Sequence, residues 1–265
     1  MKRGPFLTVM LVLGLVFLYG PIVSLVIYSF NESRLVTVWS GFSTRWYGAL
    51  LQNDEILTAA WLSLRIAAIS ATGALVVGTL AGYTLSRFRT FRGRTLFAGM
   101  VSAPLVMPEI ITGISMLLLF IGMEQWIGWP VGRGMMTIIL AHITFCLSFV
   151  AVIVQSRLAD LDISVEEAAM DLGARPIQVF FLVTLPLMAP ALIAGWLLAF
   201  SLSLDDLVIT SFVSGPGSTT LPLVIFSKVK LGLSPEINAL ATVIVAVVSI
   251  GVAIAAFFQL RRGEG

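Results

Sequence analysis

Six long apolar stretches joined by short polar connections constrain this chain more than any other feature of its sequence. A helix of roughly 20 apolar residues crosses the about 30 Å hydrocarbon core of a bilayer. The stretches occupy residues 6–30, 56–85, 97–123, 135–156, 188–213 and 237–260. Together with their connections they use the whole chain. We therefore predict an all-α membrane protein of six transmembrane helices in a single domain, residues 1–265.

The composition supports this interpretation, because 58% of the 265 residues are hydrophobic and only 11% are charged. A soluble fold could not bury so much apolar surface. The first stretch follows Lys2 and Arg3, but its uncharged run exceeds the roughly 7 to 15 residues of a signal-peptide core, so we predict a retained helix. Cys146 is the only cysteine, which excludes an intramolecular disulfide.

The distribution of basic residues predicts the orientation of the six helices, because cytoplasmic loops carry an excess of Lys and Arg. With both termini cytoplasmic, the inner segments hold Lys2, Arg3, Arg87, Arg89, Arg92, Arg94, Arg157, Arg175, Arg261 and Arg262. The outer loops hold only Arg34, Arg45, Arg133, Lys228 and Lys230. The bias favours both termini inside.

The inner connection between the fourth and fifth stretches is acidic and carries signals of a helix pair. Ser164 and Glu167 have the spacing of a capping box, which predicts a helix start. Gly173 suits the left-handed turn that ends such a helix. Pro176 suits the first turn of a second helix, and Pro186 is expected to end it. We predict two short helices over about residues 164–185 at the cytoplasmic surface.

This connection resembles the cytoplasmic signature of binding-protein-dependent ABC importer permeases, which have the type I importer fold. Glu167-Ala168-Ala169 precedes Gly173 at the family spacing, and Val183-Thr184-Leu185-Pro186 follows after nine residues, with Val where the family has Ile. The resemblance implies that the two short helices are coupling helices that insert into a groove on a separate ATPase subunit. It assigns ATPase coupling to Glu167, Ala168, Ala169, Gly173 and Pro186.

The chain has no Gly-Lys dipeptide and so no phosphate-binding loop of the Gly-x-x-x-x-Gly-Lys kind. The resemblance implies a non-catalytic transmembrane subunit that binds no cofactor or metal itself, with ATP and Mg held by the partner ATPase.

Ionisable residues inside apolar stretches are costly and usually functional, so they indicate the substrate class. Glu109 is expected about 18 to 20 Å from the cytoplasmic side, and Asp205 and Asp206 about 26 Å. These carboxylates favour a cation. The alternatives are that Arg65 pairs with one of them, or that the aspartates cap a helix end. Trp196 is a further pathway candidate through cation-π attraction, with core packing favoured.

Other segments are similar to polyamine importer permeases, and most of all to the second permease subunit of putrescine importers. They are residues 21–31, 103–109, 202–206 and 212–217. The resemblance implies a complex in the bacterial cytoplasmic (inner) membrane, comprising a second permease subunit, two ATPase subunits and a periplasmic polyamine-binding protein. Glu109 stands where Asp is expected in close relatives, which keeps the charge and lengthens the reach of the side chain.

The favoured function is thus a permease subunit that moves putrescine inward by alternating access, with acceptance of spermidine left open. Its other partner is membrane lipid, and no nucleic acid is expected. One alternative is an ABC permease for ferric iron, thiamine or an organic anion. Another is a stand-alone ion-coupled carrier, which would leave the cytoplasmic helix pair unexplained. His142, the only histidine, is expected to form a hydrogen bond within the bundle.

Overall fold

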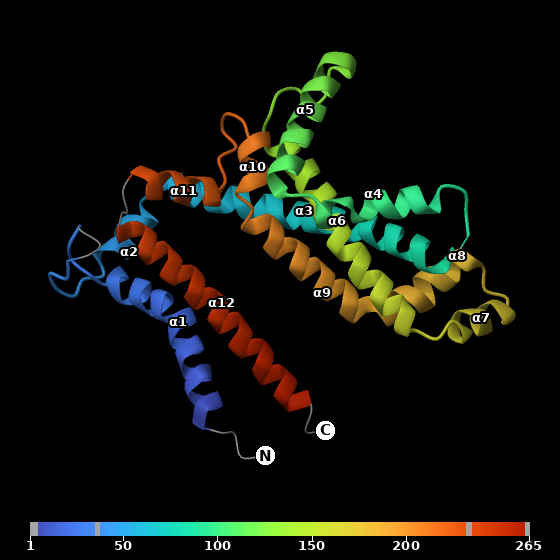
Figure 1. Cartoon of the computed structure of the whole chain (residues 1–265), viewed down its shortest axis with the longest axis horizontal. Coiled ribbons are helices and arrows are strands. Elements are labelled where there is room, and N and C mark those ends of the chain that lie inside the picture. The colour runs from blue at the N-terminus through green and yellow to red at the C-terminus, as the bar shows by residue number, and fades with distance from the viewer. Residues whose placement is uncertain (1–4, 35–37, 89, 232–234, 263–265) are drawn as a thin grey trace. The chain divides into compact units, whose positions relative to one another are not determined.

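The computed structural model describes residues 5–34, 38–88, 90–231 and 235–262, and its regular structure is helical apart from one isolated bridge between Asn31 and Phe42 (Figure 1). The helices are α1 (Pro5–Ser29), α2 (Arg45–Leu51), α3 (Asp54–Arg87), α4 (Arg94–Val106), α5 (Glu109–Ile127), α6 (Met135–Asp160), α7 (Ser164–Asp171), α8 (Pro176–Val179), the π-helical segment η1 (Phe180–Thr184), α9 (Leu185–Leu204), α10 (Val208–Val213), α11 (Leu221–Leu231) and α12 (Pro235–Arg262). Lys2, Arg3 and Arg89, on which the orientation argument draws, lie outside the described residues.

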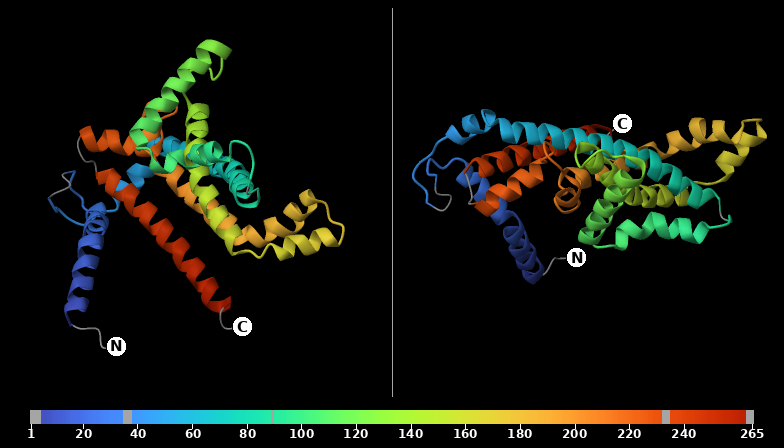
Figure 2. Two further views of the ribbon diagram at one scale, coloured as in Figure 1. Left: turned by 45° about the vertical axis from the view of Figure 1, so that its right-hand side comes forward. Right: turned by 90° about the horizontal axis from the view of Figure 1, so that it is seen from above.

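The chain divides into two compact units, of which the first comprises Met1–Thr58 and Val224–Gly265. Within it, α12 packs against both α1 and α2. The loop after α1 is folded around buried Asn31, whose side chain bonds to Val38 and Ser40 and whose carbonyl accepts the Trp46 indole N–H. The start of α1 and the end of α12 lie at the same end of this unit (Figures 1 and 2).

The second unit, Ala59–Leu223, is built around α6, which packs against α9, α4 and α10 (Figures 1 and 2). Side chains of α6 such as Ile138, Cys146, Val150 and Val154 are fully buried, so α6 is the central helix of this unit. They join buried residues of α3 and α9 in one apolar cluster.

Two glycines bring α3 into close contact with α6. A Cβ atom on Gly78 would lie 2.7 Å from the carbonyl oxygen of Leu147, and one on Gly82 would lie 2.8 Å from that of Ala151. Real side chains do not approach that closely. The Gly-x-x-x-Gly spacing therefore allows backbone-to-backbone packing of the kind that drives helix association in membranes.

Five helices in the described part of the chain are long and apolar enough to cross a membrane: Phe6–Ser29, Asp54–Arg87, Glu109–Ile127, Met135–Asp160 and Pro176–Leu204. Three of them coincide with the first, second and fourth predicted spans to within a few residues, and their crossing of a membrane stays a prediction. The sixth predicted span, 237–260, falls within the bounds of α12, whose described side chains end at Gly251. It stays a prediction.

The third predicted span, 97–123, is wrong as one helix. The chain instead forms α4 and α5, separated by Met107 and Pro108 in extended conformation. Proline has no N–H to donate and disfavours a helical conformation in the residue before it. Pro108 therefore ends one helix, and the next begins at Glu109.

The fifth predicted span, 188–213, is wrong at both ends. A continuous helical run begins at Pro176 and ends at Leu204, and α10 follows as a separate short helix. The chain leaves the helix at Asp205 to Leu207 because a side chain there binds the N–H groups of the next helix, as described below.

Candidate functional site

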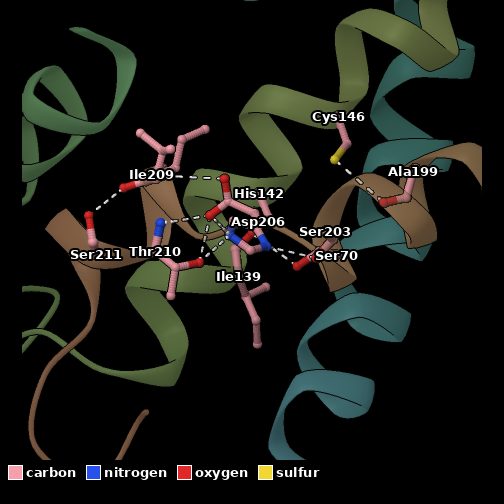
Figure 3. Close-up of polar contacts among 11 residues, drawn as sticks. Ser70, Ile139, His142, Cys146, Ala199, Ser203, Asp206, Ile209, Thr210 and Ser211 are labelled. Atoms are coloured by element: carbon pink, nitrogen blue, oxygen red, sulfur yellow. Dashed lines mark hydrogen bonds and ion pairs between the residues drawn. The ribbon is translucent and has the colours of Figure 1, made fainter. Parts of the chain in front are cut away.

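The break between α9 and α10 holds a cluster of buried polar side chains (Figure 3). His142 on α6 points into this break, with Nδ1 2.7 Å from the Ser203 hydroxyl. Its Nε2 lies 3.2 Å from Oδ2 of Asp206 and 3.0 Å from the Thr210 hydroxyl. All four residues are buried. The prediction of a hydrogen-bonded histidine inside the bundle is confirmed.

Asp206 caps α10. Its Oδ2 accepts hydrogen bonds of 2.7 Å from both the backbone N–H and the hydroxyl of Thr210, and its Oδ1 accepts one of 3.3 Å from the N–H of Ile209. A carboxylate at a helix start satisfies N–H groups that have no partner within the helix. The helix-end cap, weighed as an alternative for the two aspartates, is thus the arrangement at Asp206.

Asp205 differs from its neighbour, because it ends α9 with an exposed side chain. Glu109 is also exposed and occupies the first position of α5. α5 packs against α10 and contacts it closely, since a Cβ on Gly113 would lie 2.5 Å from the Phe212 ring. One exposed carboxylate therefore lies at each of these two interruptions of the apolar helices.

Trp196 stacks on Phe200 with ring centroids 5.2 Å apart, and its indole N–H donates to the Thr72 hydroxyl on α3 at 3.1 Å. Both aromatic rings pack against the main apolar cluster. The favoured core-packing role of Trp196 is confirmed, and its contact with substrate stays a prediction.

Arg65 does not neutralise the candidate acids in the described structure. The ion pairs formed within the described ranges are Arg87–Glu166 and Lys228–Glu55, and Asp206 is hydrogen-bonded to His142. Arg65 is exposed on α3 and belongs to none of them. The described residues also contain no group of three or more His, Cys, Asp or Glu side chains placed to hold a metal ion.

The helix pair between α6 and α9 forms close to the predicted positions, and α7 begins at Ser164 as expected. The predicted capping box is wrong, because Ser164 is the first helical residue and makes no side-chain cap bond. Asp162 accepts the Ser164 N–H at 3.0 Å instead. This bond lowers the pKa of the Asp162 carboxyl below its ordinary value.

Gly173 has φ +91°, the left-handed conformation that the sequence predicts after α7, and Pro176 opens α8. Pro186 does not end this second helix. The helix continues through the π-helical segment η1 into α9. A proline clashes with the carbonyl of the residue four positions earlier, here Leu182, and the wider π turn makes room for it.

The residues assigned to ATPase coupling lie mainly on the surface of this segment. Glu167, Ala168, Gly173 and Pro186 are exposed, and Ala169 is half-buried. Large apolar side chains of the segment are exposed around them: Val165, Met170, Leu172, Ile177, Phe181 and Leu182. An apolar exposed surface of this kind is typical of a protein interface.

The largely buried pair of Arg87 and Glu166 is not predicted from the sequence. The guanidinium of Arg87, at the end of α3, donates to both Glu166 carboxylate oxygens at 2.9 to 3.2 Å. The two residues are 79 positions apart, and no spacing rule joins them. The one general signal is that a charged side chain buried without a partner is costly, so Arg87 and Glu166 each need one.

Comparison with known proteins places these features in a family. Residues 74–262 match the model of the binding-protein-dependent transport system inner membrane component. The chain is 60% identical to the putrescine transport system permease protein PotI of Escherichia coli K12, covering 99% of this chain and 93% of that protein. It is 45% identical to the spermidine/putrescine permease PotC of the same organism, over 91% and 88% of the two chains.

A solved structure has the same fold. It is a chain of the bacterial alginate ABC transporter in complex with an alginate pentasaccharide-bound periplasmic protein, with TM-score 0.73 and 17% identity over 97% of this chain and 93% of that one. The matches in sequence and fold agree with the helical architecture and with the cytoplasmic signature. The chain therefore belongs to the binding-protein-dependent transport system inner membrane components, the multi-pass permease subunits of ABC importers.

Proposed function

We propose that this chain is one of two permease subunits of an ATP-driven importer that carries putrescine into a bacterial cell. The observation that supports the substrate is the 60% identity with a putrescine permease over 99% of the chain. The 45% identity with a spermidine/putrescine permease favours the same class of organic polycation.

The exposed carboxylates of Glu109 and Asp205 suit this cargo. Each lies at an interruption of an apolar helix, and a carboxylate beside hydrocarbon attracts a cation more strongly than it would in water. Putrescine carries an ammonium group at each end of an alkyl chain. We infer that Glu109 and Asp205 meet these groups in the pathway, whereas Asp206 supports the break from inside through its bonds to His142 and Thr210.

The segment from α7 to η1 supports the coupling function. Its exposed apolar residues and small Ala168 fit a groove on an ATPase subunit, as a helix fits a groove in other complexes. We infer that two such ATPase subunits hold ATP and Mg, so that this chain catalyses no reaction. A periplasmic polyamine-binding protein delivers the substrate from outside, and both termini face the cytoplasm.

In the proposed cycle, closure of the ATPase dimer moves the coupling helices, and the bundle alternates between outward and inward access. The non-helical connections at 107–108 and 205–207 are positions where helices can change direction without breaking regular hydrogen bonds.

Reconstitution tests this function. The complete complex in liposomes, with ATP on the ATPase side and labelled putrescine loaded on the binding protein, should accumulate label, and spermidine should compete better than amino acids or organic anions. Accumulation without ATP, or by this chain alone, would instead identify a stand-alone carrier. Uptake of labelled ferric iron, thiamine or an anion, with no uptake of putrescine, would identify a permease for another solute.

A further inference from the structure

A buried ion pair attaches the first helix of the coupling segment to the membrane-spanning bundle. Arg87 Nη2 lies 2.9 Å from Glu166 Oε1, and Arg87 Nε lies 3.0 Å from Oε2, which is a two-pronged contact. The side chains are 13% and 11% exposed. A planar guanidinium fixes both the distance and the orientation of a carboxylate in this geometry, which a single ammonium contact does not.

The pair joins four elements of the second unit. Arg87 is the last residue of α3, and its Nη1 also donates to the carbonyl of Leu158 near the end of α6, at 3.3 Å. Glu166 belongs to α7 and accepts a second bond, of 3.0 Å, from the Thr184 hydroxyl in η1. Beside it, the rings of Tyr83 on α3 and Phe180 on η1 meet edge to face, 4.9 Å apart. The ends of two spans, the first coupling helix and the start of α9 thus share one junction.

Adjacent glutamates on α7 face different surroundings. Successive residues of a helix point about 100° apart, because 3.6 residues complete a turn. Glu166 is therefore buried against α3 and η1, while Glu167 is exposed on the outer surface with the apolar residues of the segment. One acid is available to a partner protein and the other is held within this chain.

We propose that Arg87 and Glu166 are a positioning pair that transmits movement of the first coupling helix to the second and fifth spans. The inference rests on the proposed coupling function of α7. When a partner subunit displaces α7, the two-pronged contact moves the end of α3 with it, and the Thr184 bond moves the start of α9. Without the pair, α7 can still dock through its exposed face but moves independently of the spans.

The test uses the assembled complex in nanodiscs and liposomes, with R87Q, E166Q and the double variant R87Q/E166Q. R92Q is the matched control, because Arg92 is an exposed cation on the connection that follows α3. Three quantities are measured for each: the amount of assembled complex, the putrescine carried per ATP hydrolysed, and the rate of backbone hydrogen exchange in residues 164–171.

In both single variants we expect the putrescine carried per ATP to fall at least fivefold, and hydrogen exchange in α7 to accelerate at least fivefold. R92Q should match the unmodified complex in both. Each single variant leaves one largely buried charge without its partner, which lowers the amount of assembled complex. R87Q/E166Q removes both charges, so the amount of assembled complex should recover while the putrescine carried per ATP stays low. Recovered assembly with low transport per ATP supports a positioning role.

Two results would overturn the proposal. One is a loss of assembled complex with unchanged transport per ATP in the complex that forms, which would make the pair merely structural. The other is unchanged hydrogen exchange in α7. If the unmodified complex hydrolyses ATP without carrying putrescine, the proposed substrate is wrong, and the positioning role is then decided by hydrogen exchange alone, which does not depend on the solute.

Discussion

His142 Nε2 and Asp206 Oδ2 lie 3.2 Å apart in the interior of the second unit, and this contact links the central helix α6 to the break between α9 and α10. Both side chains are at least nine-tenths buried. Since Asp206 also holds the first N–H groups of α10, the contact fixes where one helix ends and the next begins.

Replacing Asp206 by Ala should destabilise the folded chain by about 3 kcal/mol, because it leaves His142 and two N–H groups of α10 without their acceptor in a buried site. D206N should cost less, since its amide oxygen still accepts the Thr210 N–H. Thermal unfolding of the chain in mild detergent measures both. An unchanged unfolding temperature in D206A would show that the buried network does not support the fold.

Asp205 provides the matched opposite case, because its side chain is exposed. We expect D205N to unfold as the unmodified chain does, while uptake of putrescine by the complete complex falls at least tenfold. Unchanged uptake would remove Asp205 from the proposed pathway, and a large loss of stability would assign it to the fold instead.

Glu109 tests whether charge or reach decides the contact with substrate. E109Q removes the charge at the first turn of α5. It should reduce uptake of putrescine at least tenfold and raise the KM of transport for the putrescine-loaded binding protein. E109D keeps the charge, with a shorter side chain, and should retain most of the uptake. Full uptake by E109Q with a loss in E109D would indicate that the length of the side chain, not its charge, is what matters.

The glycines of α3 make a prediction about packing. A valine at position 78 meets the Leu147 carbonyl and the Val150 side chain, so G78V should destabilise the chain by about 2 kcal/mol. Gly99 is the control: it is exposed in α4, and nothing lies within 4 Å of its added Cβ. G99A should be neutral or stabilise by about 0.5 kcal/mol through helix propensity. Urea titration in detergent measures both, and equal stability of the two variants would contradict close packing at Gly78.

The parts of the fold that the sequence predicts well are those where hydropathy alone decides. Residues 6–30 and 135–156 are long uninterrupted apolar runs, and each forms one helix with little shift of its ends. The breaks were missed although local signals exist. Pro108 disfavours a helical residue before it, and Asp206 three positions before Ile209 has the spacing of a helix cap.

Other features cannot be predicted from one sequence. The π-helical turn before Pro186 depends on how the surrounding helices let the backbone widen, and nothing in the local residues requires it. The pair of Arg87 and Glu166 depends on tertiary packing across 79 residues. By contrast, the coupling helices follow from local rules, since Gly173 and Pro176 have the roles that their backbone preferences predict.

Gly173 offers the sharpest test of the coupling segment, because its constraint is conformational and not steric. Its φ of +91° is strained for a residue with a Cβ, yet nothing lies within 4 Å of the position that a Cβ would take. A β-branched valine should cost about 1 to 2 kcal/mol at this turn and change its conformation, whereas asparagine tolerates a left-handed conformation better.

We therefore expect G173V to abolish uptake and to reduce co-purification of the ATPase, while G173N retains both in large part. Binding of putrescine by the periplasmic protein should be the same with either variant. Normal uptake by a normal amount of G173V in the membrane would show that the left-handed turn is not needed for coupling, and equal loss in both variants would show that the side chain itself, by blocking the docking surface, is the cause.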